Sequence, residues 1–221
     1  MTVAFNGEAP NVVFKVPGTY AGMEVAKYLT HKGIGVNITV NYSVSQQLIF
    51  ADIIEKGDAR HCYLTQMNKR LELPVALELG EGDCDSARKI SSWSSTAVIR
   101  RAYDILYKEK GYKKSVLLGA SINRPWHVDR VITKGDDHPL HTTITWEQLV
   151  EFDNDLKELR SCISDKVNGE ILKTLLKSET FVKAFEPDAL KPEDFDSFKP
   201  TLKTLEGFRE HYTQFIKWCQ E

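Results

Sequence analysis

The chain has 221 residues, of which 42% are hydrophobic and 27% charged, values typical of a folded globular domain and not of a disordered or low-complexity chain. Its 29 Lys and Arg nearly balance 31 Asp and Glu, so the formal net charge of -2 gives no electrostatic reason to expect nucleic acid or an anionic membrane as a partner. The N-terminal residues MTVAFNGE lack the features of a signal peptide, and no apolar run reaches the roughly 18 residues of a membrane span.

The first two thirds of the chain predict alternating strands and helices. We expect five strands, over 11–16, 35–42, 61–65, 115–120 and 140–145. The helices expected between them cover 22–32, 45–55, 96–110 and 126–134. Between the third strand and the helix over 96–110 we expect an irregular loop over 69–95 that contains at most a short helix. Thr19 and Ser43 are placed to begin the first two helices, and Gly33 and Gly57 to end them.

A βα repeat of this kind predicts a parallel sheet whose faces are covered by helices, which is an α/β fold. Beyond Trp146 the pattern predicts helices over 147–167, 169–177 and 205–218, with a connecting loop over 188–200. We therefore expect a single domain over 1–221, with βα units over 1–146 and a mainly helical part over 147–221.

Lys15 is the most informative residue, because it lies inside an apolar strand just before the loop at the strand's C-terminal end. An apolar setting disfavours the ammonium form, and active sites of parallel α/β barrels lie at the C-terminal strand ends. These points suggest a lysine that forms a Schiff base. The alternative from the strand pattern alone is a lysine on an edge strand that extends into solvent.

Several polar residues accompany the strand ends. Asn37 and Thr39 alternate on one face of the second strand and either line a pocket or lie on a solvated face. Thr65 ends the third strand, while Arg70 and Arg124 follow the third and fourth strands, where an arginine suits a phosphate or is simply an exposed surface residue.

No pattern in the sequence points to a metal or to a cofactor. The six histidines do not have metal-ligand spacing, and the sequence contains no G-x-S-x-G, P-loop or dinucleotide motif. The four cysteines, Cys62, Cys84, Cys162 and Cys219, are scattered without a C-x-x-C pair, which favours reduced thiols in a cytoplasmic protein over a disulfide scaffold or a structural zinc site.

The segment VVFKVPGTYAGMEVA around Lys15 resembles the Schiff-base lysine segment of transaldolases. The block LTHKGIGVNIT over 29–39 resembles the glycine and the Asn-Leu-Thr strand of that family, and SVSQQ over 43–47 resembles its next helix start. The segment YKKSVLLGAS over 112–121 resembles the strand that leads to a phosphate-binding arginine, and LEGFR over 205–209 resembles the C-terminal helix.

The resemblance implies a fold, a reaction and a role for each matching residue. The fold would be a parallel (β/α) barrel of TIM type, here with about five βα units and a helical C-terminal extension. Lys15 would attack the ketose carbonyl, Asn37 would bind the substrate, and Thr39 would help to hold the catalytic water. Thr65 stands where the family has a pocket serine. The remaining substrate-binding candidates are Arg70, Ser121 and Arg124, although Asn123 occupies the position at which the family places its second arginine.

The implied activity is transfer of a dihydroxyacetone unit between sugar phosphates in the pentose phosphate pathway. Sugar phosphates are the expected partners, with a possible homodimer and no cofactor. Only about ten residues precede the Lys15 strand, so we expect no counterpart in this sequence to the family's first three βα units, which carry its acidic proton shuttle.

Three readings remain open: a transaldolase without its N-terminal part, a transaldolase-like binding or regulatory protein without turnover, and a different lysine-imine aldolase.

Overall fold

The strands form one parallel sheet. The structure is a computed structural model that describes residues 11–80, 84–122, 124–153 and 160–220. The sheet has five strands in the order in which they occur in the chain. They are β1 (Phe14–Pro17), β2 (Val36–Asn41), β3 (Cys62–Met67), β4 (Ser115–Ala120) and β5 (His141–Thr142). The predicted α/β class and its parallel strands are confirmed.

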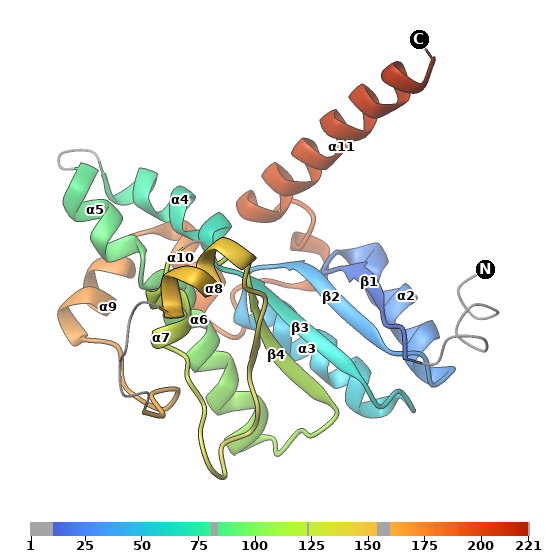
Figure 1. Ribbon diagram of the computed structural model, residues 1–221, viewed down its shortest axis with the longest axis horizontal. Coiled ribbons are helices and arrows are strands. Elements are labelled where there is room, and N and C mark those ends of the chain that lie inside the picture. Colours follow the sequence, from blue (N-terminus) through green and yellow to red (C-terminus); the bar gives the residue numbers. More distant parts are fainter. Residues whose placement is uncertain (1–10, 81–83, 123, 154–159, 221) are drawn as a thin grey trace.

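Helices connect the strands and continue after them (Figure 1). The connecting helices are α2 (Tyr20–His31), α3 (Val44–Lys56), α4 (Asn68–Leu79), α5 (Cys84–Ser91), α6 (Ser94–Tyr103) with a π-helical continuation over Asp104–Glu109, and α7 (Trp126–Asp129). After β5 come α8 (Trp146–Asp153), α9 (Gly169–Leu175), α10 (Glu179–Phe185), a 3-10 turn over Pro192–Asp194, and α11 (Lys199–Gln220). Most of α11 projects away from the body of the molecule (Figure 1). No helix in the described part of the chain is long and apolar enough to cross a membrane.

The predicted helix starts are confirmed by their capping bonds. The Thr19 hydroxyl accepts a hydrogen bond from the Gly22 amide at 3.1 Å, and the Ser43 hydroxyl accepts one from the Gln46 amide at 3.1 Å. Gly33 follows α2 with a φ of +72°, the left-handed conformation that favours glycine after a helix.

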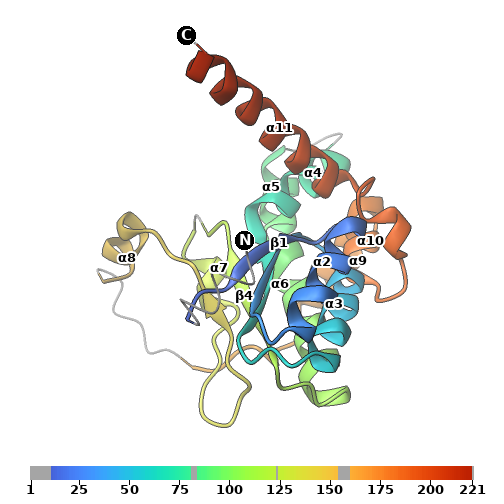
Figure 2. The ribbon, with the colours of Figure 1, turned by 90° about the vertical axis from the view of Figure 1, so that its right-hand side faces the viewer.

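The two faces of the sheet differ in their cover. Helices α2 and α3 lie on one side of the sheet, and α8 lies on the other (Figure 2). On the helix-covered face the strand side chains are 3% exposed or less: Val16, Val36, Ile38, Leu64 and Leu117. On the opposite face Lys15 is exposed, while Asn37 and Leu118 are half-buried. Among the described residues β1 pairs only with β2 and β5 only with β4, so these five strands do not close into a barrel.

The expected loop over 69–95 is wrong, because most of this segment forms α4 and α5. Pro74 suggested a break in the helix, since proline cannot donate the hydrogen bond that continues one. In the structure α4 continues through Pro74, with Leu71 and Val75 fully buried on either side of it. Burial of these apolar side chains outweighs the single lost backbone bond.

Three further elements are shorter than expected. The helix after β4 ends at Asp129 instead of residue 134, and β5 covers only His141 and Thr142. The Thr143 amide still donates to the Gly119 carbonyl at 2.9 Å, but the Thr145 amide donates to the side chain of Gln148, at 3.2 Å. The helix expected over 147–167 is confirmed only for Trp146–Asp153, and residues 154–159 lie outside the described part.

Residues 160–167 are not helical. The amides of Cys162 and Ile163 donate to the carbonyl of Ile132, at 3.0 and 3.2 Å, instead of to the preceding helical turn. The helix expected over 169–177 is confirmed as α9, the one expected over 205–218 lies within α11, and α10 was not expected.

Candidate active site

The candidate residues of the first three strands lie together on the open face of the sheet. The parallel register pairs Lys15 with Asn37. Residues paired in this way in adjacent strands present their side chains on the same face. Thr65, on β3, donates from its hydroxyl to Asn37 Oδ1 at 2.5 Å. Lys15, Asn37 and Thr65 therefore belong to three neighbouring strands and face the same space.

The side chains of this group are not equally accessible. Thr65 is 3% exposed and Asn37 is half-buried, whereas Lys15 is exposed on β1. The desolvation expected from the apolar neighbours of Lys15 is therefore not supplied by the described residues. In this respect Lys15 matches the alternative of an edge-strand lysine that reaches solvent.

Thr39 and Arg70 are linked to one another through other side chains. The Thr39 hydroxyl contacts Met67 Sδ at 3.8 Å, and the Tyr42 hydroxyl contacts the same sulfur at 3.4 Å. Tyr42 also shares a hydrogen bond of 2.6 Å with the hydroxyl of Thr204, on α11. Burial raises the pKa of Tyr42 above its usual value, in spite of this hydrogen bond and the nearby positive charge of Arg70.

Arg70 is held by α11. Its Nη1 donates to Thr204 Oγ1 at 3.1 Å, and its guanidinium lies 5.4 Å from the ring centroid of Phe208. The side chain is nevertheless exposed, so further donors are available to a ligand. The base of α11 thus completes the surroundings of the β2 and β3 strand ends.

Gln46 is a positioning residue that the sequence reasoning missed. It is fully buried, and its Nε2 donates to the carbonyl of Gly18 at 2.6 Å and to that of Val40 at 3.4 Å. Its Oε1 accepts from the Tyr42 amide at 3.0 Å and from the Ser43 hydroxyl at 3.1 Å. Gln46 therefore ties the end of the Lys15 strand to the end of the Asn37 strand.

This connection stabilises an unusual backbone. Val40 has a φ of +53°, which is costly for a β-branched residue. A Cβ on Gly18 would lie 3.1 Å from the Val40 carbonyl oxygen, so the two strand ends approach closely. The spacing of Ser43 and Gln46 is that of a capping box, which is the signal that could have identified Gln46.

Ser121 and Arg124 follow β4, the strand that pairs with β3. Ser121 follows β4 with a φ of +56°, and Arg124 is exposed, with its guanidinium 5.9 Å from the ring centroid of Trp126. Asn123 lies outside the described residues. Arg124 lines a cleft of about 610 Å³ together with residues of α4 and α5. Among the described residues no hydrogen bond joins Ser121 or Arg124 to Lys15, Asn37 or Thr65.

Two of the histidines, His127 and His138, contact other side chains of the fold. His127 Nε2 is bonded to Glu72 Oε1 at 2.6 Å, and the ring of His138 stacks on Tyr107 with 3.7 Å between the centroids. Within the described ranges, no three His, Cys, Asp or Glu side chains are grouped so that they could hold a metal ion.

The arrangement defines an α/β protein with a lysine on the first strand of a parallel sheet. The family model described as transaldolase/fructose-6-phosphate aldolase matches residues 3–193. The chain belongs to this family, which confirms the resemblance seen around Lys15.

Individual relatives agree over shorter segments. The chain is 43% identical over 49 residues to a probable transaldolase 2 of Bacillus cereus, a match that covers 22% of each protein. It is 27% identical over 129 residues to a probable transaldolase of Dictyoglomus turgidum, covering 58% of this chain and 49% of the relative. It is 28% identical over 127 residues to a probable transaldolase of Dehalococcoides mccartyi, covering 58% of this chain and 47% of the relative. The chain thus matches about half or less of the length of these curated relatives.

Proposed function

We propose that the chain performs transaldolase-type chemistry, in which Lys15 forms an imine with a ketose phosphate. The observation that carries the proposal is the pairing of Lys15 with Asn37, whose side chain is in turn bonded to Thr65. Family membership supports the same reaction class.

The amine of Lys15 adds to the ketose carbonyl carbon, and loss of water from this adduct leaves a protonated imine. Cleavage of the C3–C4 bond of the ketose, the second carbon–carbon bond from the imine carbon, with loss of the C4 hydroxyl proton, then releases an aldose phosphate, and the imine takes up the electron pair left on C3. The resulting three-carbon carbanion adds to the aldehyde carbon of the acceptor, and hydrolysis returns the free amine of Lys15. A dihydroxyacetone unit is thereby transferred without any net oxidation or reduction.

The orientation of Asn37 supports its role in substrate binding. Since Oδ1 accepts the hydrogen bond from Thr65, Nδ2 is the part of the amide that can donate to a substrate hydroxyl. Thr39 lies on the same strand two residues further on, where its hydroxyl can hold a water molecule beside the imine. Ser121, Arg70 and Arg124 are proposed to bind substrate, the two arginines through its phosphate groups.

Cleavage also requires a group that transfers protons. Among the described residues, no hydrogen bond or ion pair joins a carboxylate to Lys15. We therefore propose that these residues suffice for imine formation and that rapid turnover depends on a proton-transfer group that they do not supply. The exposure of Lys15 and the lack of such a group favour the second candidate function, a transaldolase-like binding or regulatory protein without turnover.

Borohydride trapping tests the proposal. The full chain is incubated with fructose 6-phosphate, reduced with borohydride, and digested for peptide mass spectrometry. We expect a covalent adduct on Lys15 that is abolished in Lys15→Arg and unchanged in Lys27→Arg, which alters an exposed lysine of α2. No adduct on Lys15, or equal labelling of all exposed lysines, would overturn the Schiff-base function.

Product analysis separates the remaining readings. Transfer to an added aldose phosphate supports a transaldolase, and release of free dihydroxyacetone without an acceptor supports a different lysine-imine aldolase. Trapping with neither product supports a binding or regulatory role. The pentose phosphate pathway, a cytoplasmic location and a homodimer belong to this proposal, and the mass of the protein in solution tests the dimer.

A further inference from the structure

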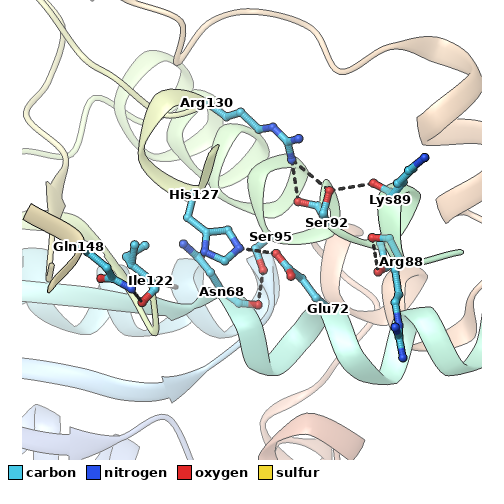
Figure 3. Close-up of polar contacts among 11 residues, drawn as sticks. Asn68, Glu72, Arg88, Lys89, Ser92, Ser95, Ile122, His127, Arg130 and Gln148 are labelled. Carbon is cyan, nitrogen blue, oxygen red and sulfur yellow. Dashed lines mark hydrogen bonds and ion pairs between the residues drawn. The ribbon is translucent and has the colours of Figure 1, made fainter. Parts of the chain in front are cut away.

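A positively charged cleft lies between α4, α5 and α7, apart from the group around Lys15. Its volume is about 610 Å³, and its charged lining residues are Lys69, Glu72, Arg88, Lys89, Arg124 and Arg130. The one carboxylate of this group, Glu72, is bonded to His127 at 2.6 Å (Figure 3). The cleft is therefore surrounded by cationic groups from three segments of the chain.

Arg130 is the most constrained of these cations. Its guanidinium lies 3.6 Å from the ring centroid of Trp93 and 5.7 Å from that of Trp126. Its Nη1 donates to the carbonyl of Ser92 at 2.8 Å (Figure 3). Burial lowers the pKa of Arg130 to about 10, although the nearby carboxylate of Glu72 acts in the opposite direction. The structure thus holds a half-buried positive charge in one orientation.

The cations of the cleft lack the partners that other cations of this chain have. Lys56, Lys108, Lys183 and Lys199 each form an ion pair with a carboxylate at 2.5 to 2.9 Å. In contrast, none of the five cations that line the cleft is ion-paired with a carboxylate of the described residues. Five cations that form no direct ion pair with a described carboxylate outnumber the one carboxylate of the lining, Glu72, so the cleft attracts an anion.

We propose that this cleft is a second anion site, which binds a small phosphorylated molecule. Guanidinium groups match the geometry of phosphate oxygens, and Arg88 and Arg130 present two of them around one cavity, with Lys69 and Lys89 beside them. Trp126, 37% exposed, offers an apolar surface beside them for the rest of the ligand. The volume suits a molecule between a sugar phosphate and a mononucleotide in size.

This inference goes beyond the proposed function. Lys15, Asn37, Thr65 and Arg70 do not line the cleft. Arg124 does line it and is also a candidate for substrate binding, so the test leaves Arg124 unchanged. It alters the two cations of α5 instead, which have no place in the proposed reaction.

Tryptophan fluorescence provides the readout. The chain has four tryptophans, of which Trp93 and Trp126 line the cleft. Trp146 and Trp218 are 74% and 71% exposed on α8 and α11, so a background with Trp146→Phe and Trp218→Phe retains only the cleft reporters. Pyrophosphate, fructose 6-phosphate and ADP are titrated into this protein, with sodium chloride at equal ionic strength as the reference.

We expect saturable binding of at least one probe, weakened tenfold or more by Arg88→Gln with Lys89→Gln. A matched double variant, Lys203→Gln with Arg209→Gln, removes the same charge from exposed positions of α11 and should change the affinity less than twofold. The probe that binds most tightly identifies whether the phosphate belongs to an inorganic ion, a sugar or a nucleotide.

The absence of saturable binding, or an equal loss in both double variants, would overturn the proposal. Lys15→Arg keeps this result separate from the Schiff-base function. If that variant loses trapping but binds the probe normally, both proposals stand. If trapping occurs without saturable binding in the cleft, only the anion site fails, and the reverse result rejects only the Schiff-base function.

Discussion

The two faces of the sheet carry different kinds of side chains, and neighbouring residues of one strand belong to different faces. On β3, Leu64 points to the helices and is 0% exposed, while its neighbour Thr65 points to the open face and donates to Asn37. On β1, Val16 is 3% exposed and its neighbour Lys15 is exposed. The alternation of a strand thus places apolar packing on one side and polar, reactive groups on the other. The helix-covered face of each strand therefore contributes to stability, and the open face carries the candidate reactive groups.

The largest expected effect comes from breaking the apolar face. Leu64→Ala should lower the free energy of unfolding by about 2–5 kcal/mol, because the fully buried site loses apolar contacts and retains a cavity. Thr65→Val, one residue away, should cost about 0.5–1.5 kcal/mol through the hydrogen bond to Asn37. Urea denaturation of the two variants measures the difference. Equal losses would contradict the division between the faces.

Glu78 connects α4 to the N-terminal ends of α10 and α11 through polar contacts. It lies on α4 and accepts hydrogen bonds from Ser178, from the amide and hydroxyl of Thr180, and from Lys199, at 2.6 to 2.9 Å. Burial alone would raise the pKa of Glu78, but these hydrogen bonds outweigh it and lower the pKa to about 2. Since the folded pKa lies below the usual value of 4.5, the contribution to stability is present above pH 4.5 and is lost as the pH falls through about 2.

The matching prediction concerns Glu78→Gln. At pH 7 the variant should lose about 1–3 kcal/mol of stability, because charged hydrogen bonds are removed from a partly buried group. The loss should shrink between pH 4.5 and pH 2, where the wild-type carboxylate becomes protonated. Glu179→Gln is the control, since Glu179 is 78% exposed in its ion pair with Lys183. A deficit that stays constant down to pH 2 would show that the carboxylate charge is not the cause.

The parts of the fold that could be predicted depend on local signals. The β-branched run of β2 and the caps Thr19 and Ser43 identify their elements directly, because each rests on neighbouring residues. Helix α4 could not be predicted, since it depends on burial of Leu71 and Val75 against elements far away in the sequence. The same limit applies to the candidate site. The motif around Lys15 is visible in the sequence, whereas the contacts of Arg70 with α11 arise only in the folded chain.

Substitution of Lys15 should have the smallest effect on stability and the largest effect on imine formation. Lys15→Gln removes an exposed side chain from a strand edge, so the free energy of unfolding should change by less than about 0.5 kcal/mol. The same variant should abolish the trapped adduct, because an amide cannot form an imine. Urea denaturation and trapping on one preparation measure both outcomes, with Lys27→Gln as the control. A loss of stability comparable to that of Leu64→Ala would mean that Lys15 is a packing residue and that the open face supports the fold. An unchanged free energy of unfolding together with loss of the trapped adduct would show that the open face carries the reactive lysine without contributing to the stability of the core.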